Sequence, residues 1–210
     1  MKKIFILIFL LVSYDSFSQL FINEYSAANY DSYQDNYGEY EDWLEIYNSG
    51  VNAVDIGGYY ISDKISNITK WQVPSSYVIP PNSVVLVFCS GRDEISANSL
   101  HTNFKITQTK GNEVLLLSDP SQNILDSVTV RPNIKSHSTG RETDGSPIWS
   151  VFEIPTPNNS NIGAFEKYEF TPVFSLPSGY YNNSAQIIIT SNNPNVTIYY
   201  TTDGSSPNNT

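Results

Sequence analysis

The sequence contains almost no cysteine or histidine: one Cys and two His stand among 210 residues. A lone cysteine rules out a disulfide framework within the chain. So small a set of nitrogen and sulfur ligands also argues against a zinc centre of the usual His/Cys type. Hydrophobic residues make up 40% of the chain, which is enough for an apolar core.

Basic residues are scarce as well. The chain has 11 Lys and Arg against 21 Asp and Glu, a net charge of −10, and only 15% charged residues in all. Binding to nucleic acid or to an anionic membrane surface needs a basic patch. The composition therefore argues against both kinds of partner.

Long hydrophobic runs are missing except at the start. Ile4 to Val12 is an unbroken apolar run after Lys2 and Lys3, and the small residues Ser16 and Ser18 follow it. This pattern is typical of a Sec signal peptide, which we place at residues 1–18. Nine apolar residues cannot cross a bilayer core, which takes ~20. We therefore expect an exported protein, secreted or at the cell surface, without a transmembrane segment.

No later stretch has a sustained helical period. Short alternating or β-branched runs, separated by turn sequences rich in Asn, Gly and Pro, predict an all-β fold of the sandwich or barrel type. The predicted strands are Leu20–Tyr25, Trp43–Tyr47, Tyr59–Ser62, Trp71–Val73, Ser83–Ser90, Glu113–Ser118, Ile124–Val130, Ile187–Thr190 and Val196–Thr201.

The run from Ser83 to Cys89 is apolar at successive positions, which predicts a central strand covered on both faces. Cys89 is either a reactive thiol or a small buried hydrophobe. A reactive thiol needs a histidine-type base, and neither His101 nor His137 lies in a recognisable signature. We therefore favour the buried hydrophobe.

The composition changes once along the chain. Pro155 to Gly163 is rich in Pro, Asn, Ser and Gly, as linkers are. We place a linker at residues 155–167, between a β-sandwich domain at 19–154 and a small β module at 168–210.

The first domain carries an ordered set of short motifs that together span most of residues 20–163. They are Phe21-Ile-Asn-Glu24, Trp43-Leu-Glu-Ile-Tyr-Asn48, Val54 to Asp63, Val78 to Val87, Glu113 to Leu117, Ile124 to Val128, Ser138-Thr-Gly-Arg-Glu-Thr-Asp-Gly145 and Pro155-Thr-Pro-Asn-Asn159.

In that order the motifs resemble the lamin tail domain in its bacterial extracellular form. The sequence departs from the family pattern at Asn82 and Asn158, where glycine is usual. The resemblance implies an immunoglobulin-like β-sandwich without known catalytic residues.

Four charged residues of these motifs form a conceivable acid–base set: Glu24, Glu45, Arg141 and Asp144. The alternative is that they pair with one another or hold loops in a sandwich. We favour the structural role and assign no catalytic residue, because no nucleophile–base pair with a known spacing is present.

Residues 29–42 combine tyrosines with acids. Tyr30, Tyr33, Tyr37 and Tyr40 alternate with the carboxylates of Asp31, Asp35, Glu39, Glu41 and Asp42. The favoured interpretation is a solvated acidic loop whose tyrosines cover one end of a sheet. Calcium binding by the five carboxylates is the second, although the spacing is not that of an EF-hand. Sugar stacking on exposed tyrosine rings is the third. No other cofactor is expected.

The C-terminal segment has its own signature. Thr171-Pro-Val-Phe-Ser175, Ile187 to Thr190 and Val196-Thr-Ile-Tyr-Tyr-Thr-Thr-Asp-Gly-Ser-Ser-Pro207 resemble the first half of the chitobiase/β-hexosaminidase C-terminal-type module, a small immunoglobulin-like β domain. We expect this half-module to need further strands from a longer gene product. Joined to a lamin-tail-like domain, it resembles the N-terminal part of secreted CotH-kinase-family proteins of the Bacteroidetes type.

These observations predict non-catalytic interaction or spacer modules in an exported or cell-surface protein, whose partner is an extracellular protein or polysaccharide. One alternative is an accessory region of an exported enzyme, a CotH-like kinase or a glycosidase, whose catalytic domain lies elsewhere. The second alternative is a glycan-binding module.

Overall fold

The computed structural model describes residues 19–164, 172–191, 197–205 and 207. The predicted signal peptide, 1–18, lies outside these residues, as do positions 165–167 of the predicted linker. The chain divides into two compact units, one up to Phe165 and one from Glu166. Secondary structure in the described residues is entirely β, as the sequence predicts.

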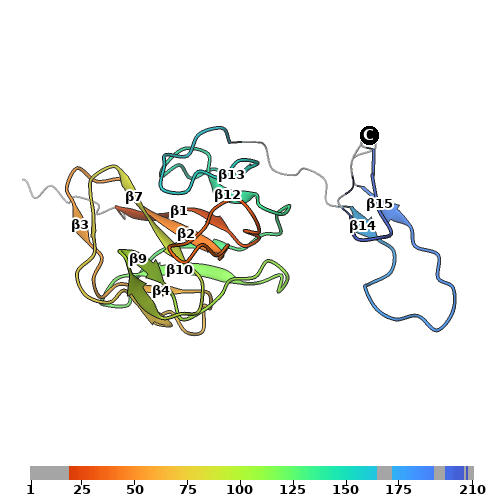
Figure 1. Ribbon diagram of the computed structural model, residues 1–210, viewed down its shortest axis with the longest axis horizontal. Coiled ribbons are helices and arrows are strands. Elements are labelled where there is room, and N and C mark those ends of the chain that lie inside the picture. Colours follow the sequence, from red (N-terminus) through yellow and green to blue (C-terminus); the bar gives the residue numbers. More distant parts are fainter. Residues whose placement is uncertain (1–18, 165–171, 192–196, 206, 208–210) are drawn as a thin grey trace, which may run out of the picture. The chain divides into compact units, whose positions relative to one another are not determined.

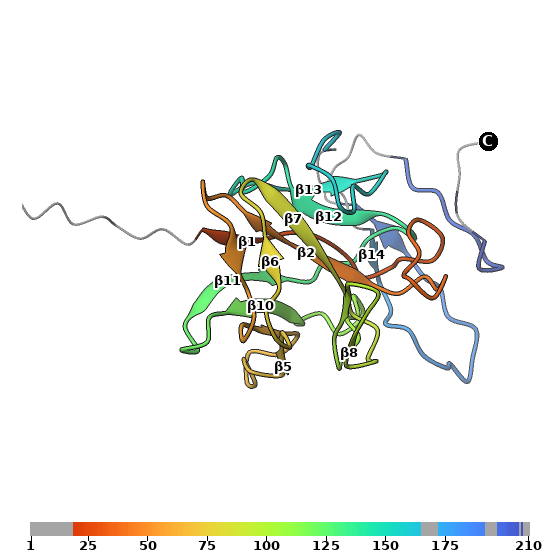
Figure 2. The same cartoon turned by 60° about the vertical axis from the view of Figure 1, so that its left-hand side comes forward.

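The first unit is a sandwich of two main sheets (Figures 1 and 2). The larger has the order β13-β12-β1-β2-β7-β9-β8, and the smaller has the order β11-β10-β4-β5. In Figure 2, β1, β2 and β7 pass above β10 and β11. Both sheets are antiparallel except where β9 runs parallel to β7.

The larger sheet contains β1 (Leu20–Ser26), β2 (Trp43–Asn48), β7 (Ser83–Phe88), β8 (Glu94–Ser96), β9 (Ser99–His101), β12 (Ser138–Arg141) and β13 (Trp149–Phe152). The smaller contains β4 (Tyr60–Ser62), β5 (Trp71–Gln72), β10 (Val114–Ser118) and β11 (Ile124–Thr129). A separate two-stranded ladder joins β3 (Val54–Asp55) to β6 (Val78–Ile79).

The main core lies between the two sheets. Ile22, Ile46 and Val87 enter it from the larger sheet, and Leu115 and Leu117 enter it from the smaller one; all five are fully buried. Burying side chains of this size contributes about 1.5–3 kcal/mol each, which makes this layer the main source of stability.

The predicted central strand is confirmed. β7 lies between β2 and β9, with Val85 and Val87 in the main core and Leu86 and Phe88 on the opposite face. That opposite face is covered by Tyr33, whose ring stacks on Phe88 at 6.4 Å between centroids. Cys89 follows the last residue of β7 and is fully buried, as predicted.

A β-bulge in β1 decides which side chains reach each face of the sheet. Ile22 pairs with Ile46, but Glu24 pairs with Glu45, so Asn23 is an extra residue opposite no partner. Regular alternation would put Ile22 and Glu24 on one face. The bulge instead sends Ile22 and Tyr25 into the core and Glu24 to the outer face beside Glu45.

The second unit contains β14 (Val173–Phe174) and β15 (Ile189–Thr190), which pair with each other. The strand predicted at Ile187–Thr190 is thus shorter than expected. The strand predicted at Val196–Thr201 is wrong over its described part, since residues 197–201 are irregular. The physical reason is that a strand needs a hydrogen-bonded neighbour, and no described residue pairs with 197–201. Ile187 and Tyr200 remain 55% and 70% exposed.

Candidate functional site

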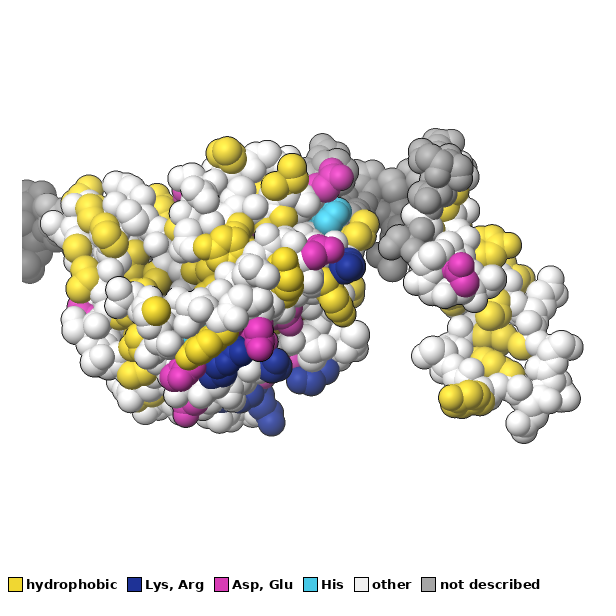
Figure 3. Space-filling model, in the orientation of Figure 1, with side chains coloured by type: hydrophobic (Ala, Val, Ile, Leu, Met, Phe, Trp, Pro, Cys, Tyr) yellow, Lys and Arg dark blue, Asp and Glu magenta, His cyan; other side chains and the backbone are white. Residues whose placement is uncertain are grey.

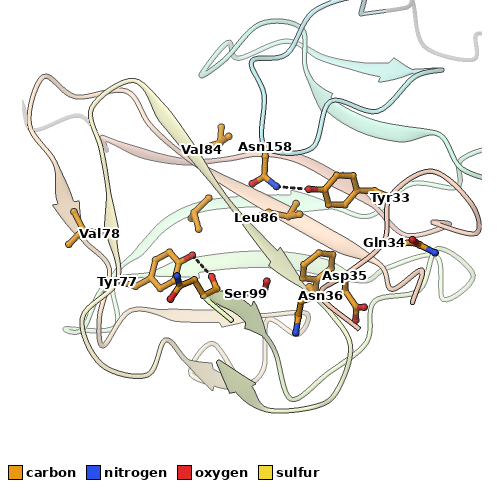
Figure 4. Close-up of a pocket in the computed structure, with 13 residues that line it drawn as sticks. Tyr33, Gln34, Asp35, Asn36, Tyr77, Val78, Val84, Leu86, Ser99 and Asn158 are labelled. Carbon is orange, nitrogen blue, oxygen red and sulfur yellow. Dashed lines mark hydrogen bonds between the residues drawn. The ribbon is translucent and has the colours of Figure 1, made fainter. Parts of the chain in front are cut away.

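The outer face of the larger sheet carries the most polar chemistry in the first unit. Trp43, Glu45 and Tyr47 alternate along β2, and their register partners on β7 are Phe88, Leu86 and Val84. Two loops lie over this face, residues 29–42 and 153–161. They meet where the Asn158 amide donates a 2.9 Å hydrogen bond to the Tyr33 hydroxyl (Figure 4).

A groove runs along β7 between these loops and the β3–β6 side of the sheet. One pocket of about 430 Å³ is lined by Tyr33, Tyr77, Asn98, Leu86 and neighbouring residues. A second pocket of about 430 Å³ is lined by Tyr47, Asn82, Asp144 and Asn159. Val84 and Asn158 line both pockets, so the two lie side by side along β7, and we refer to them together as the β7 groove.

The floor and walls of the groove differ in chemistry. Val84 and Leu86 project from β7 and form an apolar floor, with Tyr33 and Asn158 on one side of the strand and Tyr77 and Ser99 on the other (Figure 4). The Tyr77 ring is held by its hydroxyl, which donates to the Asn98 carbonyl at 2.8 Å. No Lys or Arg is among the described residues that line the two pockets.

Beside the groove, under the loop at 153–161, lies a buried polar cluster around Glu24 and Glu45, both 0% exposed. Glu24 accepts hydrogen bonds from the Ser138 hydroxyl and from the Thr156 N–H and hydroxyl. One oxygen of Glu45 accepts from the Asn158 N–H, and the other, Oε2, has no hydrogen-bond partner. The two carboxylates therefore hold the loop at 153–161 onto the sheet.

The pKa values of both carboxyls are raised above their usual range. Burial is the main cause for each, and the neighbouring Glu24 charge raises the pKa of Glu45 further. Hydrogen bonds from Ser138 and Thr156 partly offset the effect on the pKa of Glu24. Burying two neighbouring negative charges is costly, so one of the two carboxyls is favoured to carry a proton. Glu45 is favoured over Glu24, because its Oε2 has no hydrogen-bond partner.

Asp144 and Arg141 both form hydrogen bonds with backbone groups of nearby segments. The Asp144 carboxylate accepts from the Asn23 amide and the Asn161 N–H. The Arg141 guanidinium donates to the carbonyls of Ile22 and Ser146 and pairs with Asp126 at 2.7 Å. Thus Glu24, Glu45 and Asp144 do come together, while Arg141 points to other partners.

Three of the five carboxylates in the loop at 29–42 form ion pairs with Arg92 or Lys105. Arg92 pairs with Asp35 at 2.9 Å and with Glu39 at 2.7 Å, and Lys105 pairs with Glu41 at 2.8 Å. Figure 3 shows Lys and Arg side chains of one face lying among Asp and Glu. In the described part of the chain, no three His, Cys, Asp or Glu side chains are arranged to hold a metal ion.

The two remaining acids of this loop have different surroundings. Asp31 is exposed and pairs with Lys135 at 3.2 Å. Asp42 is partly buried and accepts a hydrogen bond from the Asn29 N–H, and burial raises its pKa to about 6. Tyr33 packs on Phe88 of β7, and Tyr37 packs against the His101 ring of β9 at 5.7 Å between centroids. Tyr30 and Tyr40 are 63% and 44% exposed.

Sequence reasoning did not predict the groove, although many of its lining residues lie in the motifs singled out. Tyr77 and Asn98 belong to no motif, and Asn82 and Asn158 appeared only as departures from a family pattern. Three of the groove asparagines, Asn82, Asn98 and Asn158, have positive φ, at 50°, 65° and 61°. A sequence signal for this conformation exists at two of them. Turn sequences such as Pro81-Asn82 and Pro157-Asn158 suggest this conformation, since Pro followed by Gly or Asn favours type II turns.

Comparison with known families agrees with this architecture. Residues 15–132 match the Lamin Tail Domain, and residues 176–210 match the Chitobiase/beta-hexosaminidase C-terminal domain. Both are non-catalytic modules. No curated protein matches the chain. None of the described residues forms a helix long and apolar enough to cross a membrane. Because the first match covers more than half of the chain, the protein belongs to the lamin tail domain family.

Proposed function

We propose that this chain is a non-catalytic binding region of an exported or cell-surface protein, with the β7 groove as its ligand surface. The observation that carries the proposal is the contrast between the open groove and the buried acids beside it. The groove walls are aromatic and amide side chains over an apolar floor, which suits binding. Glu24 and Glu45 are 0% exposed, so neither can reach a ligand in the groove.

The acids that do line the groove are engaged elsewhere. Asp35 accepts from the backbone N–H groups of Tyr37 and Glu39 and pairs with Arg92. Asp144 accepts from Asn23 and Asn161. A glycosidase needs one free acid and one free carboxylate facing a shared substrate, and this groove offers no such pair.

Two measurements test the proposal. Cell fractionation with N-terminal sequencing should find the protein outside the cytoplasm and beginning at Gln19; a cytoplasmic protein that retains Met1 would contradict export. Glycosidase and kinase assays should find no turnover. An activity that Asp144→Asn abolishes, while the exposed control Glu142→Gln retains it, would contradict the non-catalytic role.

A second candidate function is an accessory region of an exported enzyme of the CotH-like kinase or glycosidase type. The observation that favours it is the match of residues 176–210 to the chitobiase/beta-hexosaminidase C-terminal domain. The coding sequence beyond the codon for Thr210 tests it directly. A kinase or glycosidase domain there would support this candidate, and a stop codon would refute it.

A further inference from the structure

We infer that the β7 groove binds an extended, uncharged polysaccharide, and that Asn82, Asn98 and Asn158 are the side chains that select it. This inference rests on the proposed function, because it names the ligand class for the same groove. Three features of the described residues carry it: the backbone conformation of the asparagines, the freedom of their amides, and the charge of the groove.

The three asparagines stand where the backbone favours glycine. Asn82 (φ 50°), Asn98 (φ 65°) and Asn158 (φ 61°) all lie in the left-handed region. Asn98 follows Ala97 in the two-residue turn between β8 and β9, and Asn158 follows Pro157 in a turn closed by a 3.0 Å bond from the Asn159 N–H to the Thr156 carbonyl. Glycine adopts these angles without strain, and asparagine tolerates them better than most residues.

Asparagine at these positions adds an amide that glycine would not. Asn82 and Asn98 are exposed, and neither side chain makes a hydrogen bond to any other described residue. The Asn158 amide donates one of its two N–H groups to the Tyr33 hydroxyl. Each amide offers two donors and an acceptor, which matches sugar hydroxyls, since these also donate and accept.

The rest of the groove suits the apolar faces of sugar rings. Val84 and Leu86 form the floor, and Tyr33, Tyr47 and Tyr77 stand along the walls of the two adjacent pockets. Tyrosine combines a flat apolar ring with a polar end, as recognition of a sugar requires. Two adjacent pockets along one strand fit a chain of several sugars better than a single sugar.

Charge selects against acidic polysaccharides. No Lys or Arg is among the described residues lining the groove, and the whole chain carries a net charge of −10. An anionic chain would meet no counter-charge there and would be repelled at long range. A peptide strand is disfavoured for another reason: the floor is the side-chain face of β7, and strand addition needs an unpaired strand edge.

Affinity electrophoresis of the full chain tests the inference. The gels contain mannan, xyloglucan or mixed-linkage β-glucan as uncharged probes, and alginate or polygalacturonate as anionic ones. We expect at least one uncharged polysaccharide to retard the protein and neither anionic one to do so. The double substitution Asn82→Gly/Asn98→Gly should weaken the retardation about tenfold, since it removes several hydrogen bonds.

The glycine variants have a matched control. Gln122 (φ 67°) is an exposed left-handed residue in the turn between β10 and β11, outside the groove. Gln122→Gly should leave retardation unchanged. Because glycine accepts positive φ, all these variants should melt at or near the temperature of the parent protein, so a loss of binding cannot be assigned to unfolding.

Failure of the inference and failure of the proposed function give different results. A third variant, Val84→Arg, fills the floor and should block any groove ligand. Binding of an anionic polysaccharide, or of clones from a displayed random-peptide library, that Val84→Arg abolishes would overturn the sugar class and leave the binding function standing. Retardation by an uncharged polysaccharide that survives Asn82→Gly/Asn98→Gly would overturn the role of the asparagines. No Val84-dependent binding of any probe would overturn both proposals.

Discussion

Replacing Glu45 by Gln should stabilise the first unit at neutral pH and flatten the dependence of its stability on pH. Glu45 and Glu24 lie opposite each other on β2 and β1, both fully buried, and Glu45 Oε2 has no hydrogen-bond partner. Burial and the neighbouring Glu24 charge raise the pKa of Glu45 well above its usual value. The folded protein therefore keeps a proton that the unfolded chain releases.

The sign of the effect follows from proton linkage. An unfolded glutamate loses its proton near pH ~4.3, whereas folded Glu45 keeps it to a higher pH. Between the two pKa values the folded state binds more protons, so the free energy of unfolding falls as pH rises, by about 1.4 kcal/mol per pH unit for one proton. The stability that protonated Glu45 contributes is fully present below the pKa of the unfolded chain and is lost as pH rises through the pKa of folded Glu45.

Glutamine resembles the protonated acid and does not titrate. Its carbonyl oxygen can still accept the Asn158 N–H that Glu45 accepts. We therefore expect Glu45→Gln to change stability little near pH 4.5, to raise it at pH 7.5, and to reduce the slope by about 1.4 kcal/mol per pH unit over the window in which folded Glu45 is protonated. Asp42, whose pKa is raised to about 6 by burial, contributes a residual slope of the same sign between pH 4 and 6.

Urea unfolding followed by tryptophan fluorescence measures the slope at four pH values from 4.5 to 7.5. Trp43 and Trp71 are buried in the first unit, so they report its unfolding. The control is Glu142→Gln, because Glu142 is exposed. The reasoning is refuted if Glu45→Gln lowers the free energy of unfolding by the same amount at every pH, or if the slope of stability against pH is the same in Glu45→Gln as in the parent protein.

Three further outcomes are expected. Gly140→Ala should destabilise the first unit by about 1–3 kcal/mol in urea unfolding, because its Cβ would lie 2.9 Å from a Phe152 ring carbon and 3.0 Å from Glu24 Cγ. An unchanged urea midpoint would contradict this and would mean that Phe152 and Glu24 move aside at little cost. Cys89 is fully buried and its thiol pKa is raised well above the usual value by burial, so iodoacetamide should label it only in denaturant; rapid labelling of the native protein, seen by mass spectrometry, would contradict this. Calcium at millimolar concentration should leave the melting temperature unchanged, because Arg92, Lys105 and Lys135 already pair with four of the five carboxylates of the loop at 29–42. A rise in melting temperature that chelator reverses would instead support the calcium interpretation, since a hundredfold excess over Kd stabilises by about 2.7 kcal/mol.

Local pattern was enough to predict the fold class. The β-rich run Trp43–Asn48 and the unbroken apolar run Val84–Phe88 predicted β2 and β7. The turn residues between the runs predicted a sandwich or a barrel, and the resemblance to the lamin tail domain implied the sandwich. The burial of Cys89 followed from the apolar run that it extends.

Strands without an apolar pattern were not predicted. Ser138–Arg141 consists of polar residues and a glycine, yet every residue of β12 is buried. Burial is possible because Glu24, Asn161 and the neighbouring strands form hydrogen bonds with its polar groups. The strand expected at 196–201 failed for the opposite reason: its residues have strand propensity, but no described residue pairs with their backbone. Propensity is local, whereas a strand exists only with its neighbour.

The sequence by itself determined the all-β class, the family and the scarcity of basic charge. Only the tertiary structure decided which side chains act together. One extra residue at Asn23 turns Glu24 to the outer face, where it meets Glu45 and, across more than a hundred positions, Thr156. The groove asparagines, Asn82, Asn98 and Asn158, belong to three separate turns. These three asparagines come together only because the strands that carry the turns are arranged in one sheet. A pattern along the sequence does not give the distance in space between turns that are far apart in the chain.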